Sequence, residues 1–511
     1  MLNGEIMKRN VCPTGITGLD EILLGGLPCF SLYSVQGEPG SGKTTFAMQF
    51  LVEGIKFGGK SLYITFSETE AELQRVAESH GLDISQVVVM DLSSLEEQLN
   101  PEATNTLFHP SEIELNQVFA LILKRIEEVN PDRIVFDSVS EMRLLAETPL
   151  RYRRQILALK QALASRKTTV LFLDDLTVAH QDLQIHSIAH GVVHLSRMDH
   201  DFGGERRRLR VIKLRGVNFT GGFHDMEIRT GGIVVHPRMI SSQHEKADFS
   251  GVLKSGSEEL DALLGGGLDK GTANLFIGPA GTGKSSMIMK YVVSATNDKE
   301  KVAYFCFDET LGNLKKRSER LGIDVTKMEN SGLLRLQKID PAEISPGALA
   351  GLIQSLVKNE GYKVIVIDSL NGYIQAMPQE NFLILQLHEL LAFLNDQGVV
   401  TLFSLAQQGM IGSMSSPIDL TYLADTVILS RYFESDGAVK KAISVIKKRT
   451  GSHENTIREY TFGPKGIVVG EVLREFEGVL SGIPKYYGKK ASPQRNSISS
   501  KKKVRTKKKA R

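Results

Sequence analysis

The stretch Gly-Glu-Pro-Gly-Ser-Gly-Lys-Thr at residues 37–44 decides the fold, and a second version, Gly-Pro-Ala-Gly-Thr-Gly-Lys-Ser, stands at residues 278–285. Both fit the pattern G-x-x-x-x-G-K-[ST], a loop that cradles phosphate groups between a strand and a helix. The glycines let backbone N–H groups approach the phosphates, the lysine reaches the β- and γ-phosphates, and the final hydroxyl ligates Mg²⁺. The following helix directs its positive N-terminus at the anion. Two such loops in equivalent surroundings predict a nucleotide-binding protein.

Each loop supplies candidate ATP-binding residues: its glycines, its lysine and the two hydroxyl residues at the start of the helix. They are Gly40, Gly42, Lys43, Thr44 and Thr45 in the first loop, and Gly281, Gly283, Lys284, Ser285 and Ser286 in the second. Because the hydroxyl after the lysine contacts the metal in such loops, Thr44 and Ser285 are also expected to be Mg²⁺ ligands.

The whole chain is an internal repeat. The two loop lysines are 241 residues apart, and Asp20 and Asp261 each precede their loop by 17 residues. An apolar strand ending in an acid follows each loop, and the acids Glu68 and Glu309 are again 241 residues apart. The period is far too long for a solenoid, so a duplicated domain explains the pattern.

A second apolar strand in each half ends in an aspartate. The stretches Arg-Ile-Val-Phe-Asp-Ser at 133–138 and Val-Ile-Val-Ile-Asp-Ser at 364–369 resemble the Walker B strand of nucleotide hydrolases. Asp137 and Asp368 are therefore predicted to coordinate Mg²⁺ through water.

The order of the elements predicts an α/β fold. Short apolar runs such as 170–173 and 400–403 follow helical stretches, which is typical of βαβ units and a mostly parallel sheet. We expect two tandem RecA-like P-loop NTPase domains with flanking helices, at residues 1–240 and 250–486, followed by a disordered basic tail at 487–511. At 511 residues and 41% apolar content, the chain can build a core in each domain.

The charge and cysteine content indicate which partners and which cellular compartment to expect. The net charge is +3, and eight of the eleven residues from 501 to 511 are Lys or Arg, so the rest of the chain carries −5. The tail could contact nucleic acid, a membrane surface or an acidic partner, or simply aid solubility. Three cysteines without metal-ligand spacing or a disulfide framework, no signal peptide and no membrane-spanning apolar run predict a cytoplasmic protein.

The duplicated pattern resembles the KaiC family of double RecA-like ATPases over about residues 11–486. Further matches are more specific than a Walker motif, and they lie at 204–208, 212–216, 425–429, 445–449, 457–460 and 480–484. The resemblance implies a Mg²⁺-dependent homohexamer of two stacked rings, with ATP between neighbouring subunits. It also implies a signalling partner of unknown identity, and it does not extend to the tail.

Two Lys-x-Arg pairs, Lys213 with Arg215 and Lys447 with Arg449, match family positions that reach the γ-phosphate of the neighbouring subunit's ATP. A cation supplied in this way stabilises the charge that develops on the transferred phosphoryl group. The alternative interpretation is a solvated basic strand edge.

The acids that follow the second strand bear on catalysis. KaiC-like sites usually carry two consecutive glutamates there, of which the first is thought to act as general base. Here the first half has Ser67 and Glu68, and the second half has Asp308 and Glu309. A serine cannot take a proton from water at pH 7, so either Glu68 serves or the first site is slow. Asp308 and Glu309 are both candidate catalytic residues of the second half.

Autophosphorylation is a further hypothesis. The circadian-clock protein after which the family is named carries a Ser-Thr pair just before the strand that here begins at Asp425, and the matching positions are Thr421 and Tyr422. Thr421 is the candidate acceptor, and the alternative is that it only packs or caps a turn.

Three functions compete. The leading interpretation is a ring-forming ATPase and possible serine/threonine autokinase that acts as a slow signalling switch. The second is a DNA-acting motor or recombinase, because RecA and replicative helicases share the fold. The body's charge of −5 disfavours nucleic acid as the main substrate. The third is a scaffold whose first ring binds ATP only to assemble.

Overall fold

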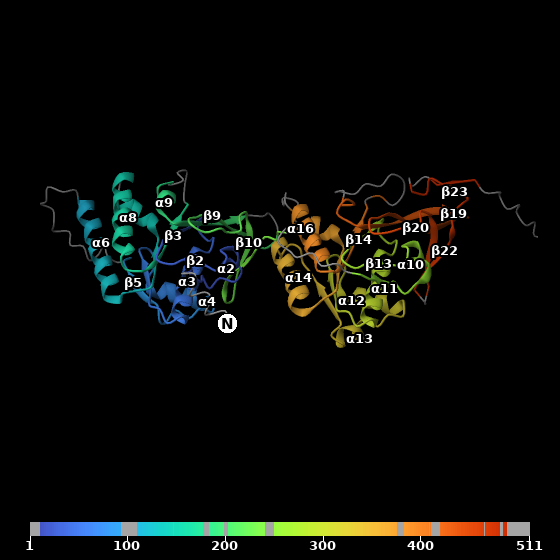
Figure 1. The fold of residues 1–511 in the computed structure, drawn as a ribbon, viewed down its shortest axis with the longest axis horizontal. Coiled ribbons are helices and arrows are strands. Elements are labelled where there is room, and N and C mark those ends of the chain that lie inside the picture. Colours follow the sequence, from blue (N-terminus) through green and yellow to red (C-terminus); the bar gives the residue numbers. More distant parts are fainter. Residues whose placement is uncertain are drawn as a thin grey trace, which may run out of the picture.

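The computed structural model describes residues 11–93, 110–146, 148–176, 183–198, 203–240, 250–375, 383–407, 409, 420–463, 466–480 and 484–487. Its two halves form two lobes side by side along the long axis (Figure 1). The residues between the two predicted domains, 241–249, and the predicted basic tail beyond residue 487 lie outside this range. No helix in the described ranges is both long and apolar enough to cross a membrane.

The first half is built on a nine-stranded sheet in the order β11-β10-β9-β8-β3-β7-β6-β4-β5. Its strands from β8 to β5 pair in parallel, and β9, β10 and β11 extend it as antiparallel neighbours. The bounds are β3 (Leu32–Gly37), β4 (Ser61–Thr65), β5 (Val88–Asp91), β6 (Arg133–Asp137), β7 (Thr169–Asp175), β8 (Gly191–Met198), β9 (Arg206–Leu214), β10 (His224–Arg229) and β11 (Gly232–His236).

Alternate residues of these strands face two separate cores, one on each side of the sheet. Val135 of β6 packs with the side that holds α3, whereas its neighbours Ile134 and Phe136 pack with the side that holds α6 and α8. This period of two is the expected pattern of a strand buried on both faces. The helices are α2 (Leu19–Ile22), α3 (Lys43–Lys56), α4 (Glu70–Ser79), α6 (Pro110–Val129), α7 (Val139–Leu145), α8 (Pro149–Ala164) and α9 (Leu183–Ile188).

The second half repeats the first. Listed from the antiparallel edge, as for the first half, its sheet runs β22-β21-β20-β19-β14-β18-β17-β15-β16. Each strand occupies the position of its counterpart in the first sheet. The strands are β14 (Ala273–Gly278), β15 (Val302–Cys306), β16 (Leu334–Lys338), β17 (Val364–Asp368), β18 (Val400–Ala406), β19 (Thr426–Ser435), β20 (Ala438–Lys448), β21 (Arg458–Gly463) and β22 (Gly466–Val472). The helices are α10 (Glu258–Leu263), α11 (Lys284–Asn297), α12 (Leu311–Arg320), α13 (Val325–Asn330), α14 (Pro346–Glu360), α15 (Leu370–Gln375) and α16 (Leu383–Asp396). The predicted α/β fold with two RecA-like halves is confirmed.

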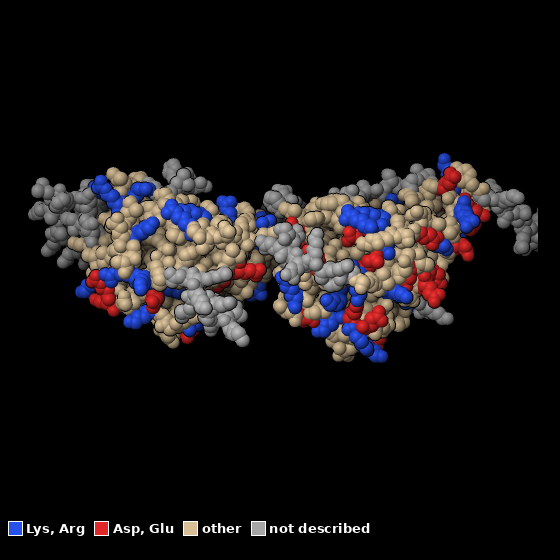
Figure 2. Space-filling model, viewed as in Figure 1, with Lys and Arg blue, Asp and Glu red and all other residues tan. Residues whose placement is uncertain are grey.

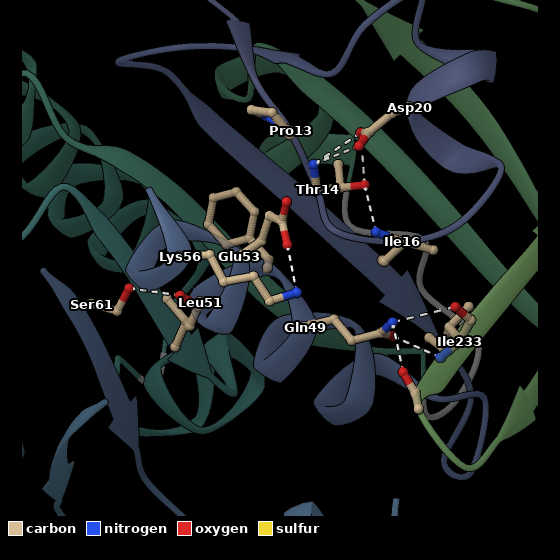
Figure 3. Close-up of polar contacts among 12 residues, drawn as sticks. Pro13, Thr14, Ile16, Asp20, Gln49, Leu51, Glu53, Lys56, Ser61 and Ile233 are labelled. Carbon is tan, nitrogen blue, oxygen red and sulfur yellow. Dashed lines mark hydrogen bonds and ion pairs between the residues drawn. The ribbon is translucent and has the colours of Figure 1, made fainter. Parts of the chain in front are cut away.

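A small two-stranded ribbon precedes each main sheet. In the first half β1 (Val11–Cys12) pairs with β2 (Leu27–Pro28), and in the second β12 (Val252–Leu253) pairs with β13 (Leu268–Asp269). In each half, the repeated aspartate, Asp20 or Asp261, forms hydrogen bonds within the segment between the two ribbon strands. Asp20 accepts hydrogen bonds from the backbone N–H and the hydroxyl of Thr14, at 2.9 and 2.8 Å (Figure 3). Asp261 accepts from the N–H of Ser255 at 2.7 Å in the same way. A final ribbon joins β23 (Phe476–Glu477) to β24 (Lys485–Tyr486).

The two lobes meet where the β9–β11 edge of the first sheet faces α14 of the second half (Figure 1). The buried carboxylate of Asp225 accepts a hydrogen bond from the N–H of Gly347, in the first turn of α14, at 2.7 Å. Arg206 donates to the carbonyls of Pro341 and Ala342 at 2.9 and 3.1 Å. Polar contacts of this kind fix the lobes in one arrangement, because breaking them would leave buried charged groups without hydrogen-bond partners.

Candidate functional site

Each phosphate loop lies at the carboxyl end of its central strand, as the motif requires. β3 ends at Gly37 and α3 begins at Lys43, and β14 ends at Gly278 while α11 begins at Lys284. The residue before each lysine, Gly42 or Gly283, has a positive φ of 101° or 97°. Only glycine adopts that conformation at low cost, so the turn that aims the helix N-terminus at the loop depends on it.

The other predicted loop residues lie in equivalent places in both halves. Gly40 and Gly281 have φ values of 76° and 79°. Thr45 and Ser286 are buried in the first turn of their helices, whereas Ser285 is half-buried at the loop itself. The two loops therefore share one backbone shape.

Both loop lysines are buried, but their partners differ. Lys43 donates to the carbonyls of Gly37 and Glu38 at 2.9 Å each, and forms an ion pair with Asp175 at 2.5 Å. Lys284 donates to two equivalent carbonyls, those of Gly278 and Pro279, at 2.9 Å. The second half has Ala406 at the strand position of Asp175.

Among the described residues, the amine of Lys284 has no carboxylate partner within ion-pair distance. Burial lowers the pKa of Lys284 to about 8, and the charge of Asp368 opposes this effect. A buried cation without a counter-charge is costly, so this site fits an anionic ligand.

The Walker-B-like aspartate of the first half lies beside the loop hydroxyl. Thr44 Oγ1 is 3.2 Å from Asp137 Oδ2, and the phenol of Tyr63 donates to the same oxygen. Burial raises the pKa of Asp137, and the hydrogen bond from Tyr63 opposes that rise. A hydroxyl and a carboxylate side by side are the hard oxygen donors that Mg²⁺ prefers, so these residues fit that ion.

Asp368 is also held by hydrogen bonds in the second half, where the tyrosine is shared with the first half but the second donor differs. Tyr304 donates to Asp368 Oδ2 and Ser404 donates to Oδ1, each at 2.5 Å. Tyr63 and Tyr304 are 241 residues apart, so the buried tyrosine is part of the repeat. These hydrogen bonds fix the orientation of the carboxylate.

The acids after the second strand are arranged differently in the two halves. In the first, Glu68 Oε2 is buried and has no partner within the described structure. Burial raises the pKa of Glu68, and the negative charges of Asp137, Glu72 and Asp175 raise it further. Glu68 therefore lies close to the Walker-B-like aspartate.

In the second half the two acids separate. The hydroxyl of Ser369, next to the Walker-B-like Asp368, donates to Asp308 Oδ2. Glu309 instead forms an ion pair with Arg317 of α12 at 2.9 Å. Asp308 is therefore the acid that faces the nucleotide side of the sheet.

The Lys-x-Arg pairs lie at the opposite end of each sheet from their own phosphate loop. Lys213 donates to the carbonyls of His186 and Ala189, the latter at 2.8 Å, and Arg215 donates to that of Ser187 at 3.0 Å. These carbonyls precede β8, which runs parallel to β3 toward the loop. Lys213 pairs with Val192, and the register places it roughly 10 Å along the sheet and roughly 10 Å across it from Gly37.

The second half repeats this placement. Lys447 donates to the carbonyls of Thr421 and Ala424 at 3.0 and 2.7 Å, and Arg449 donates to that of Tyr422 at 2.8 Å. Thr421 is half-buried, and it precedes β19 at the end of the sheet remote from the loop at Gly278.

Four features of the two sites were not predicted from the sequence. They are the two buried tyrosines, the ion pair of Asp175 with Lys43, and the partner of Glu309. The tyrosines could have been found from the sequence, because each is the third residue of the apolar strand after its loop. No sequence pattern indicates the partners of Asp175 and Glu309, since these depend on where neighbouring strands and helices end.

Comparisons with known proteins agree with this geometry. A family model described as "ATPase: KaiC" matches residues 12–240 and again residues 253–474. The chain is 27% identical to the circadian clock oscillator protein KaiC of Prochlorococcus marinus, over 94% of each chain. It is also 27% identical to the protein of that name from Synechococcus elongatus, over 92% of this chain and 91% of the relative. The circadian clock protein KaiC3 of Synechocystis is 26% identical over 95% and 97%. These matches give no support to the DNA-acting alternative.

Proposed function

The chain belongs to the KaiC ATPase family and is a two-domain ATPase, and from this premise we propose that it is a ring-forming autokinase that signals through its nucleotide and phosphorylation state. In this proposal the second half transfers the γ-phosphate of ATP to Thr421 of a neighbouring subunit. The protein acts in the cytoplasm as a homohexamer with a signalling partner, and its first half hydrolyses ATP slowly or holds it for assembly.

One observation carries the proposal: Thr421, Lys447 and Arg449 lie at the end of the sheet remote from the phosphate loop of the same subunit. Lys447 and Arg449 hold the turn at Thr421 and Tyr422 by its carbonyls, and that turn precedes β19. The register of Lys447 with Val427 and Leu275 places it roughly 10 Å along the sheet and roughly 10 Å across it from Gly278. Because these groups cannot reach their own loop, they support transfer between subunits.

The residues would divide the work as follows. The loop and Lys284 hold the phosphates, and Ser285 and Asp368 would hold Mg²⁺, which neutralises phosphate charge when bound. Asp308, oriented by Ser369, accepts the proton of the attacking hydroxyl. Lys447 and Arg449 face the next subunit's γ-phosphate. In the first half Thr44, Asp137 and Glu68 take the corresponding roles, with Lys213 and Arg215 as the cations.

The charge distribution favours a protein partner over nucleic acid. On the face shown in Figure 2, basic side chains form separate patches on both lobes, and acidic side chains lie among them on the second lobe and lower down on the first. The described residues on this face form no continuous basic stripe. A nucleic-acid motor is expected to carry such a stripe along the path of the strand.

The first test compares ATP turnover and intact mass of the wild type, Lys43→Ala and Lys284→Ala. We expect Lys284→Ala alone to abolish the gain of one phosphate, and mass spectrometry to place that phosphate on Thr421. Absence of phosphate between Met410 and Arg431 in the wild type after ATP incubation would exclude the autokinase.

Mixed rings test transfer between subunits. Thr421→Ala keeps the catalytic residues and lacks the acceptor, whereas Lys284→Ala keeps the acceptor and lacks the ATP site. Neither variant alone should be phosphorylated, but mixed subunits should place phosphate on the Lys284→Ala chain. Phosphate that appears on Lys284→Ala incubated alone contradicts the assignment of the second loop.

A further inference from the structure

Two cysteines of the first half lie together although the sequence separates them. Cys12 ends β1 and Cys29 directly follows β2, and their sulfur atoms are 2.7 Å apart. Both thiols are free and half-buried. A disulfide joins its sulfurs at about 2.05 Å, so bond formation needs a shift of well under 1 Å.

The ribbon holds the two residues in this relation. Val11 pairs with Pro28 and Cys12 pairs with Leu27, so Cys29 lies just beyond the last rung of the ladder. The backbone then turns at Phe30, whose φ is 58° and whose N–H donates to Thr169 Oγ1 at 3.0 Å. That hydrogen bond anchors the segment to the start of β7, beside the central strand β3.

The surroundings make the two thiols unequal. The hydrogen bond from Cys29 lowers the pKa of Cys12 against the effect of burial, and Thr169 and Arg133 lower it further. Thr169 Oγ1 is 3.3 Å from the Cys12 sulfur, and the Arg133 guanidinium donates to the carbonyl of the adjacent Pro13 at 2.9 Å. The pKa of Cys29 is raised, by the same hydrogen bond and by burial. The thiolate is the nucleophile in disulfide exchange, so Cys12 attacks first.

The duplicated half lacks this pair. The positions 241 residues further on are Leu253 and Lys270, and Lys270 forms an ion pair with Glu300 at 2.6 Å. The remaining cysteine, Cys306, is buried and donates to the carbonyl of Glu309 at 3.0 Å. Burial raises the pKa of Cys306 to about 11, which makes it an internal control of low reactivity.

We propose that Cys12 and Cys29 are a redox modification site that closes to an intramolecular disulfide with a small-molecule disulfide of the glutathione type as oxidant. The Cys12 thiolate attacks one sulfur of the oxidant, forms a mixed disulfide and releases one thiol. Cys29 then loses its proton and attacks the Cys12 sulfur, which releases the second thiol. The protein loses two hydrogen atoms, and the oxidant is reduced to two thiols.

The consequence is confined to the first half. The bond ties the β1–β2 ribbon to the segment that enters β3, the strand that ends in the first phosphate loop. Disulfides in cytosolic proteins are mostly transient and redox-sensing, which fits two accessible thiols. The proposal does not depend on the autokinase and can fail separately from it.

The test equilibrates the full-length protein in glutathione buffers from fully reduced to fully oxidised, followed by acid quench, alkylation and mass spectrometry. No Lys or Arg lies between the two cysteines, so cleavage is made at Glu21 instead. We expect the oxidised wild type to lose two hydrogen atoms, to yield two linked peptides, and to keep Cys306 alkylated. Cys306→Ser should behave as the wild type, and Cys12→Ser and Cys29→Ser should give no link.

A comparison with unfolded protein keeps the test decisive if a variant fails to fold. The native wild type should close the bond at a thiol-to-disulfide ratio at least about tenfold more reducing than the same protein in urea, because the fold raises the effective concentration of one thiol at the other. Equal ratios in the two states, a link through Cys306, or only a mixed disulfide with glutathione overturns the proposal.

Discussion

At the residue scale, the two phosphate loops share a backbone but differ in the charges around their lysines. Asp175 pairs with Lys43 at 2.5 Å, whereas the second half has Ala406 at that strand position. A carboxylate there competes with phosphate for the amine. In the second loop the lysine is buried and has no carboxylate partner within the described ranges, so this loop is the stronger candidate for tight ATP binding.

Substitution of the acids in the second half separates catalysis from structure. Asp308→Asn should lower second-site turnover by about 10²–10⁴-fold, because Asp308 is the proposed proton acceptor of this site. Glu309→Gln should change turnover less than about tenfold, since Glu309 pairs with Arg317 on α12. Steady-state ATP hydrolysis in a Lys43→Ala background measures both. A larger loss in Glu309→Gln than in Asp308→Asn contradicts the assignment.

The pKa of Lys284 predicts a pH dependence of ATP binding. The pKa is lowered to about 8 without ligand, and only the charged amine attracts phosphate. Affinity at the second site should be constant below pH 8 and weaken by up to about tenfold per unit above it. Binding of a fluorescent ATP analogue to Lys43→Ala in EDTA, from pH 6 to 9.5, measures this. The matched Lys284→Ala variant reports the first site, and an inflection near pH 8 there instead contradicts the prediction.

At the element scale, the strand-to-helix turn of each loop depends on one glycine conformation. Gly283 has φ of 97°, and a Cβ there would lie 2.2 Å from the Phe462 ring of β21. The antiparallel extension of the sheet thus packs against the loop. The conformation of the second loop therefore depends on the residues of the loop and also on its packing against β21.

A pair of glycine substitutions tests this dependence. Gly283→Ala should abolish ATP binding at the second site, because the clash and the positive φ both oppose the loop conformation. Gly312→Ala, in α12 where a Cβ meets nothing within 4 Å, should leave binding unchanged and raise stability by up to about 0.5–1 kcal/mol. Calorimetric binding titrations and thermal unfolding check both variants. Retained ATP affinity in Gly283→Ala would count against the role of this turn.

At the scale of the whole molecule, duplication gave two similar lobes that now meet through unlike surfaces. The β9–β11 edge of the first lobe contacts α14 of the second, and Asp225 bridges Arg208 and Gly347 at 3.1 and 2.7 Å. Residues of both lobes also line a cavity of about 350 Å³ beside this bridge. The junction therefore combines buried polar contacts with a cavity lined by both lobes.

Removal of the bridge should uncouple the lobes. Asp225→Ala removes the buried acceptor that the Arg208 guanidinium shares with the Gly347 N–H, at a cost of about 3–5 kcal/mol. We expect calorimetry to show one unfolding transition for the wild type and two for Asp225→Ala. Arg229→Ala, on the same strand but in an exposed ion pair with Glu227, is the control and should keep one transition. A single, unshifted transition in Asp225→Ala contradicts the coupling.

The sequence by itself determined the family, the duplicated α/β fold and the positions of the phosphate loops. These follow from local patterns: each loop is one continuous stretch, and each buried strand is one apolar run, so no distant contact was needed to find them. The roles of the predicted site residues, the hexamer, Mg²⁺ and the phosphorylation of Thr421 stay predictions.

Only the tertiary structure decided which side chains share a site. Asp308 and Glu309 are neighbours in sequence, yet one contacts Ser369 and the other Arg317, because the turn after β15 sends them in different directions. Asp175 contacts Lys43, and Cys12 contacts Cys29, through strand pairing. Such contacts join segments whose separation in sequence carries no pattern, so packing alone could bring them together.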